Sequence, residues 1–146
     1  MALSTDKYEN KIKKAETWED MEKVLKELPK VTLRQRVEEL CKKYEKSFSF
    51  VCGFAGIPES TFYAAINGTR TPKKDLIIKF SIVLGATKDE LNELLKLANL
   101  KELYAKNNED AIVMYGIKNG LDLEEIDMLL KSQHCKMRFF REKSNG

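Results

Sequence analysis

Residues 50–72, FVCGFAGIPESTFYAAINGTRTP, constrain the fold more than any other part of the chain. Gly56 interrupts a first helical pattern, and Pro58 pre-sets a backbone angle that suits the first turn of a new helix. Gly68 ends that second helix, because glycine tolerates the left-handed conformation at a helix C-terminus. The stretch therefore predicts two short helices joined by a tight glycine turn.

The second of these helices has two different faces. Its apolar residues recur at helical spacing and predict a buried face made of Phe62, Ala65 and Ile66. The opposite face is small or polar and consists of Ser60, Tyr63, Ala64 and Asn67. Arg70 follows, and Thr71-Pro72 predicts the start of the next helix. A helix with a small or polar outer face and a basic exit suits the major groove of DNA.

The composition is typical of a soluble, helix-rich protein, with 42% hydrophobic and 34% charged residues in a chain of 146. No apolar run approaches the ~18 residues that a membrane-spanning helix needs. The first 14 residues lack the apolar core of a signal peptide. The cysteines, Cys41, Cys52 and Cys135, are odd in number and lack metal-ligand spacing, which favours free thiols in a reducing cytoplasm.

The net charge of +3 is distributed unevenly along the chain. Residues 85–134 carry 6 basic and 10 acidic side chains. Residues 47–84 carry 4 basic and 2 acidic ones, and residues 135–146 carry 4 basic and 1 acidic. An acidic surface repels phosphate, so only the motif region and the C-terminal tail are candidates for facing nucleic acid.

The N-terminal part predicts one amphipathic helix before the motif. Residues 1–14 are polar and lysine-rich, which favours disorder or a frayed helix. Residues 15–31 predict an amphipathic helix that Thr17 caps and Pro29 stops. The next helix opens with the capping box of Thr32 and Gln35, and Ser47 or Ser49 caps the first helix of the motif.

The C-terminal half contains an internal repeat. Shifting the chain by 35 positions overlays residues 73–100 on residues 108–135 with 8 identities in 28 positions. Both copies read as helix, glycine turn and capped helix, with T-x-x-E in the first and D-x-x-E in the second. We expect two stacked helical hairpins, in which the apolar run of residues 76–85 forms the central buried helix.

The sequence offers little support for an enzyme. It contains no glycine-rich phosphate loop, nucleophile elbow, H-E-x-x-H or C-x-x-C motif. The single histidine, His134, precedes Cys135, and the side chains of neighbouring helical residues diverge. We therefore expect no catalysis, no cofactor and no metal site.

Residues 50–72 and the helices around them resemble the lambda-repressor-like helix-turn-helix family, also known as the Cro-repressor or xenobiotic-response-element type. The match runs through Cys52, Gly56-Ile57, Ser60-Thr61-Phe62, Ile66-Asn67-Gly68, Arg70 and Pro72, and it continues to VLGATKDELNELL. The resemblance covers about residues 32–97 and implies a compact five-helix domain, often dimeric, in a bacterial or phage transcriptional regulator.

The whole chain is thus expected to be all-α, with five domain-level parts. These are a polar segment (1–14), an amphipathic helix (15–31), the helix-turn-helix domain (32–98), an added hairpin (99–133) and a basic tail (134–146).

The resemblance also assigns residues to a DNA interface. It implies a recognition helix over about residues 58–67 in which Glu59, Ser60, Tyr63 and Ala64 face base edges. It implies phosphate contacts by Asn67, Thr69, Arg70, Lys73 and Lys74. Double-stranded DNA is then the partner, bound by a homodimer that needs no cofactor.

Two observations keep a second hypothesis open. The predicted recognition helix has no Arg, Lys or Gln for bidentate base readout and carries the acidic Glu59. The helix before it is unusually aromatic, with Phe48, Phe50 and Phe54, which either pack on the Trp18 helix and the C-terminal tail or expose a surface to a protein partner or second subunit. The alternative is a protein-interaction module, such as an adaptor or antitoxin-like inhibitor, that has lost DNA binding.

Overall fold

The computed structural model describes residues 5–27 and 31–140, and within these residues the chain is all-α, as predicted. None of the described helices is long and apolar enough to cross a membrane. The helices are α1 (Thr5–Lys14), α2 (Trp18–Glu27), α3 (Leu33–Lys43), α4 (Phe48–Ala55), α5 (Glu59–Ile66), α6 (Lys74–Leu84), α7 (Lys88–Leu97), α8 (Asn108–Lys118) and α9 (Leu123–Ser132).

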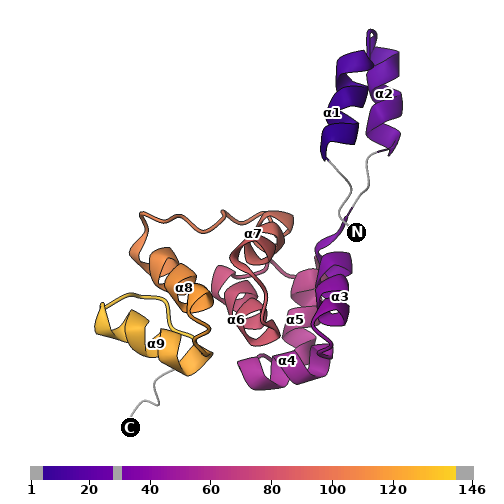
Figure 1. Ribbon diagram of the computed structural model, residues 1–146. Coiled ribbons are helices and arrows are strands. Elements are labelled where there is room, and N and C mark those ends of the chain that lie inside the picture. The colour runs from indigo at the N-terminus through magenta and orange to yellow at the C-terminus, as the bar shows by residue number, and fades with distance from the viewer. Residues whose placement is uncertain (1–4, 28–30, 141–146) are drawn as a thin grey trace. The chain divides into compact units, whose positions relative to one another are not determined.

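The chain divides into a small unit, Met1–Val31, and a larger unit, Thr32–Gly146. In the small unit α1 and α2 contact each other as a hairpin (Figure 1). The polar sequence of residues 1–14 favours disorder or a frayed helix, whereas Thr5–Lys14 forms the helix α1. A helix this short is marginal alone, and its contact with α2 accounts for its formation. The Thr17 hydroxyl accepts a hydrogen bond from the Asp20 amide at 3.1 Å, which confirms the predicted cap, whereas the stop at Pro29 lies outside the described residues.

In the larger unit α6 is the central helix. It contacts α4, α7 and α9, and Figure 1 shows it between the α3–α5 group and the α8–α9 hairpin. Its fully buried side chains include Ile77, Ile78, Phe80 and Leu84. The prediction that the apolar run of residues 76–85 forms the central buried helix is therefore confirmed.

The helix starts of the larger unit follow the predicted capping pattern. Ser47, rather than Ser49, caps α4 and accepts a hydrogen bond from the Phe50 amide. Reciprocal capping boxes open three helices, at Thr32 with Gln35, Thr87 with Glu90 and Asp122 with Glu125. These side chains satisfy amide groups that the first turn of a helix leaves without partners.

The two predicted hairpins are α6–α7 and α8–α9, and they contact each other through α6 with α9 and α7 with α8. Gly116 of α8 lies against Ile126 of α9. A Cβ atom at Gly116 would stand 2.4 Å from Cδ1 of Ile126, whose side chain is fully buried. The packing of α8 on α9 therefore leaves no room for a side chain at Gly116 unless Ile126 moves.

Glu90 joins α7 to α3 through a buried carboxylate. It accepts hydrogen bonds from the Lys43 ammonium at 2.6 Å, from the Tyr44 hydroxyl, and from the Thr87 amide at 2.9 Å. Burial by itself raises the pKa of Glu90, but the hydrogen bonds from Lys43, Thr87 and Tyr44 outweigh it and lower the pKa to about 2. This carboxylate therefore stabilises the fold in its charged form.

The beginning of the predicted basic tail is part of the folded unit. Phe139 is buried, and its amide donates a 2.6 Å hydrogen bond to Asp127 of α9. The Met137 amide donates to Glu109 of α8. Arg138 is consequently half-buried beside the core, while Arg141 and Lys143 lie outside the described residues.

Two glycines inside helices should respond in opposite ways to alanine. Gly116→Ala should destabilise the protein by about 1–3 kcal/mol, because the new methyl group collides with the buried Ile126 side chain. Gly53→Ala in α4 should be neutral or stabilising by up to about 1 kcal/mol, because open space surrounds that position and alanine favours helix. Urea unfolding of both variants checks this, and equal effects would contradict the packing of α8 on α9.

Glu90 should make stability depend on acid pH. Its folded pKa of about 2 lies below the ordinary value of 4.5, so its contribution is complete above pH 4.5 and is lost as the pH falls toward 2. Glu90→Gln keeps an amide oxygen for the capping box but removes the charge, and should cost about 1–2 kcal/mol at pH 7.

The matched control is Glu93→Gln on the same helix, where the exposed ion pair with Arg36 predicts a cost of about 0.5 kcal/mol. Thermal unfolding between pH 2.5 and 7 measures both variants. A Glu90→Gln deficit that stays constant down to pH 2.5 would contradict the charged hydrogen-bond cluster.

Candidate nucleic-acid interface

The turn between α4 and α5 is built around Gly56. Its φ angle of 68° lies in the left-handed region, where only glycine avoids strain. The Gly56 amide donates to Gly53, and the Ile57 amide donates to the Cys52 carbonyl at 2.9 Å. The Ile57 side chain is buried, so the turn is anchored from both the backbone and the core. This geometry confirms the glycine turn predicted from the sequence.

The two faces of α5 are those that the sequence predicted. Phe62, Ala65 and Ile66 are buried. The outward face is exposed at Glu59, Ser60, Tyr63 and Asn67 and half-buried at Ala64. This set of five residues is called the α5 face below.

Tyr63 is held by an aromatic neighbour on α4. Its ring stacks on that of Phe48 at a centroid distance of 4.1 Å, and Phe48 also packs against Phe62 and Phe80. Of the three phenylalanines of α4, Phe48 thus belongs to the core of the larger unit. Phe50 and Phe54 remain 47% and 68% exposed and pack against each other at 4.6 Å.

Residues 67–73, here called the exit loop, are tied to the end of α5. The carbonyl of Ala64 accepts hydrogen bonds from the Thr69 amide at 3.0 Å, the Thr69 hydroxyl at 3.0 Å and the Arg70 amide at 3.1 Å. The loop therefore leaves the helix in one defined direction. Thr69, predicted to contact phosphate, has its hydroxyl proton directed to this carbonyl, while its oxygen can still accept.

Arg34 joins this surface although the sequence interpretation did not include it. Its Nη1 donates to Asn67 Oδ1 at 3.1 Å, and its Nε donates to Glu38 at 3.0 Å. The residue comes from α3, 33 positions before its partner. In the sequence it resembles any charged residue on a solvated helix face, and no local signal distinguishes it.

The cations of the exit loop and the adjoining start of α6 differ in their availability. Lys74 Nζ lies 2.7 Å from Asp110 Oδ1, and the Asp110 side chain is only 3% exposed. Asp110 also accepts from the Tyr104 amide at 2.9 Å, so Lys74 connects α6 to the second hairpin. Arg70 and Lys73 are exposed, and neither forms a side-chain hydrogen bond or ion pair with any described residue.

The start of α6 differs from the prediction. The helix begins at Lys74, with Lys73 as its N-cap, rather than at Thr71-Pro72. Lys73 adopts an extended backbone and makes no side-chain capping bond, so the first amide groups of α6 receive no side-chain cap. The helix start is therefore displaced by two residues from the predicted start at Pro72.

The metal-ligating side chains of the described ranges do not form clusters. No cluster of three His, Cys, Asp or Glu side chains within them could hold a metal ion. His134 is exposed at the end of α9 with a left-handed φ of 56°. Burial, with smaller contributions from Glu59 and Cys41, raises the pKa of Cys52 to about 12, which keeps that thiol protonated and unreactive.

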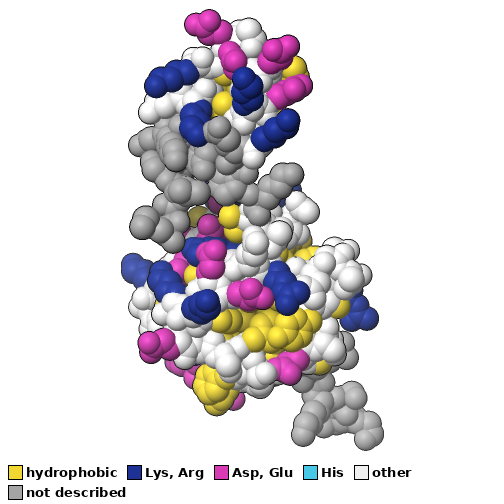
Figure 2. All heavy atoms as spheres, turned by 90° about the vertical axis from the view of Figure 1, so that its right-hand side faces the viewer, with side chains coloured by type: hydrophobic (Ala, Val, Ile, Leu, Met, Phe, Trp, Pro, Cys, Tyr) yellow, Lys and Arg dark blue, Asp and Glu magenta, His cyan; other side chains and the backbone are white. Residues whose placement is uncertain are grey.

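The surface charge is mixed where Figure 2 shows it. On that face of the larger unit, Lys and Arg side chains alternate with Asp and Glu around a patch of apolar side chains. No broad single-sign field covers this view. On this face, a contact with phosphate would consequently rest on individually placed cations.

Comparison of the chain with protein-family models, with curated proteins and with solved structures found no match. The functional argument therefore depends on the α5 face, the exit loop and Arg34.

The two adjacent lysines of this region should behave differently. Lys74→Ala should destabilise the protein by about 2 kcal/mol or more, because it leaves the buried Asp110 carboxylate without its cation. Lys73→Ala should change the free energy of unfolding by about 0.5 kcal/mol or less, since its side chain is exposed. Chemical denaturation measures both, and a silent Lys74→Ala would contradict the ion pair.

Proposed function

We propose that the larger unit is a lambda-repressor-like helix-turn-helix domain and that the protein is a DNA-binding transcriptional regulator. In this proposal α5 is the recognition helix. The observation that carries it is the Gly56 turn, which presents a short helix with a buried apolar face and an outward polar face. Arg70 and Lys73 at the helix exit, which pair with none of the described residues, support it.

Arg34, Arg70 and Lys73 have the chemistry for phosphate contacts, which set the register and orientation of a protein on the duplex. Ser60 and Tyr63 of the α5 face then have the chemistry for base edges in the major groove. Asn67 keeps its amide N–H groups available, because its oxygen already accepts from Arg34. Glu59 fits only where it can accept a hydrogen bond from cytosine.

Only three cations are assigned to phosphate in this proposal, and one of them, Arg34, already pairs with Glu38, so we expect weak electrostatic binding. Neutralising three phosphates gives a salt slope of about −3 in log K against log salt. Sequence readout from a single domain would then be modest. A dimer that reads two half-sites about one helical turn, roughly 34 Å, apart would raise both affinity and specificity.

A second candidate function rests on the exposed aromatic pair of Phe50 and Phe54. Beside it lies a hollow of about 430 Å³ whose apolar lining includes Val83 and Leu121. Exposed aromatic side chains beside a hollow with mixed walls, which here also include the acidic Asp122 and Glu124, are typical of protein interfaces. This surface suits the second subunit of a dimer, or a different protein if the domain is an interaction module without DNA binding.

Selection from a random double-stranded DNA library at two salt concentrations tests the proposal. We expect an enriched motif, and fluorescence anisotropy on that motif should give a salt slope of about −3 for each bound domain. Arg70→Ala with Lys73→Ala should weaken binding roughly tenfold to a hundredfold on all sequences alike and reduce the slope to about −1. Ser60→Ala or Tyr63→Ala should instead alter the preferred sequence.

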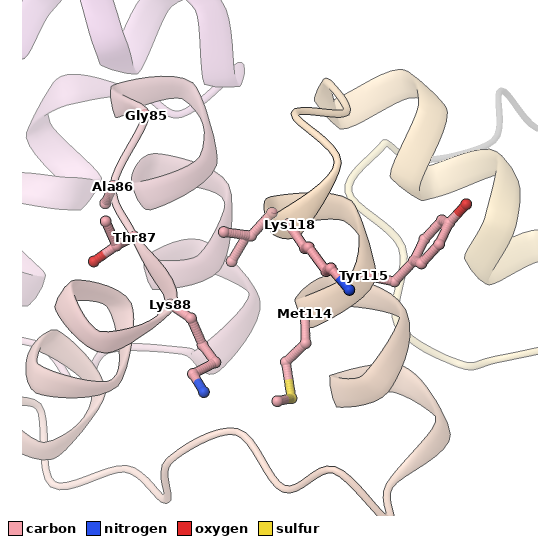
Figure 3. A pocket seen from close by; sticks show the side chains of 8 residues that line it. Gly85, Ala86, Thr87, Lys88, Met114, Tyr115 and Lys118 are labelled. Carbon is pink, nitrogen blue, oxygen red and sulfur yellow. The ribbon is translucent and has the colours of Figure 1, made fainter.

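The matched control is Lys88→Ala with Lys118→Ala, which removes the same charge from the groove between the two hairpins (Figure 3). This control should leave DNA affinity nearly unchanged. A library without enrichment at either salt concentration would contradict DNA binding and favour the interaction module.

A further inference from the structure

A cavity of about 600 Å³ lies on the inner side of α5, away from the α5 face. Its walls come from the glycine turn, the exit loop, α6 and the C-terminal segment. Apolar side chains form part of the lining, namely Ile57 of the turn, Leu76 of α6 and Phe139. The volume falls within the range of about 300–1,000 Å³ that small-molecule sites occupy.

The charged residues that line this cavity are mostly basic. Four cations border it, Arg70, Lys73, Lys79 and Arg138, against the single acid Asp75. They come from three separate segments of the chain, and the fold brings them together around apolar walls. Such a combination of apolar walls and converging charges is characteristic of ligand sites.

Two of these cations are positioned rather than free in solvent. Arg138 is half-buried, and its Nη1 donates hydrogen bonds to the carbonyls of Cys135 and Met137. The segment that carries it is fixed by the bond from the Phe139 amide to Asp127. The guanidinium therefore forms part of a fixed wall, and its other N–H groups make no hydrogen bond within the described residues.

Lys79 of α6 has no direct counter-ion in the part of the chain that the structure describes. It is half-buried, and among the described residues it forms no salt bridge. Burial lowers the pKa of the Lys79 ammonium, and the more distant carboxylates of Asp75 and Asp127 only oppose that change. A partly desolvated ammonium beside a cavity is stabilised by an anion that enters the cavity.

We propose that this cavity binds a small organic anion, in which a carboxylate, sulfonate or phosphate group on an apolar body contacts Lys79 and Arg138. The apolar body packs on Ile57, Leu76 and Phe139. The groove of Figure 3 is a weaker candidate, because its two lysines, Lys88 and Lys118, are both exposed and already solvated.

Binding at this site has a consequence for the DNA interface, and this step rests on the proposed function. Arg70 and Lys73 belong both to the cavity lining and to the exit loop. An anion in the cavity competes with phosphate for these two cations. Occupancy should therefore lower the affinity for DNA.

The probe for the test is 8-anilinonaphthalene-1-sulfonate, an anion on an aromatic body. The full chain should bind it at one site with a dissociation constant on the order of tens of micromolar, as the size of the probe predicts. Neutral N-phenyl-1-naphthylamine, which has the same rings without the sulfonate, should bind about tenfold more weakly. Fluorescence titration and calorimetry measure affinity and stoichiometry.

Lys79→Met keeps the length of the side chain and removes its charge, so it should weaken sulfonate binding about tenfold. Lys88→Met is the control and should leave binding unchanged. Amide shifts of the isotope-labelled wild-type protein locate the probe even if the first variant does not fold. Shifts confined to residues that line the cavity, such as Ile57, Lys79 and Arg138, support the site.

Equal affinity for the charged and neutral probes, equal effects of the two substitutions, or shifts elsewhere would overturn the anion site. The DNA measurement stands apart from these results. A protein that binds the probe at this cavity but enriches no DNA sequence keeps the anion site and contradicts the proposed function. A protein that binds DNA but not the probe keeps the proposed function and contradicts the anion site.

Discussion

Phe62 of α5 stacks on Phe80 of α6 with ring centroids 4.3 Å apart and planes inclined by 18°. Both side chains are fully buried, and Phe48 of α4 packs against both rings. An eight-residue helix has little stability of its own, so α5 depends on this contact. The stack also fixes the rotation of α5, because the burial of Phe62 determines which side chains point outward.

A second group of constraints comes from buried carboxylates paired with lysines. Glu90 with Lys43 joins α7 to α3, and Asp110 with Lys74 joins α8 to the start of α6. The acidic C-terminal half, which repels phosphate as a surface, therefore serves in part to hold the basic segments of the larger unit. The same arrangement pairs Lys74 with Asp110, whereas Arg70 and Lys73 form no ion pair with any described residue and the exposed Arg34 pairs with Glu38.

Much of the fold could be predicted from local patterns. Capping residues such as Thr87 and Asp122 act within their own helix turn, and Gly56 is required by a backbone angle, so short sequence windows suffice for them. The outward face of α5 followed from helical spacing in the same way. The interpretation failed where a contact spans the chain.

Three residues show this limit. Lys74 appears in the sequence as one of two adjacent basic residues, and only the distant Asp110 separates its role from that of Lys73. Arg34 reaches Asn67 from a different helix. Phe139 lies in a segment that composition describes as a basic tail, yet hydrogen bonds to α8 and α9 build that segment into the fold. Neither helical periodicity nor a local motif predicts contacts between residues so far apart in the sequence.

The central claim is that α5 and the exit loop form a DNA surface. Titration of the isotope-labelled full chain with a short random-sequence duplex, followed by amide chemical shifts, tests it most directly. The account predicts shifts at Ser60, Tyr63, Asn67, Arg70 and Lys73 that diminish as salt is raised. Absence of shifts at low salt, or shifts centred on α8 and α9, would contradict it.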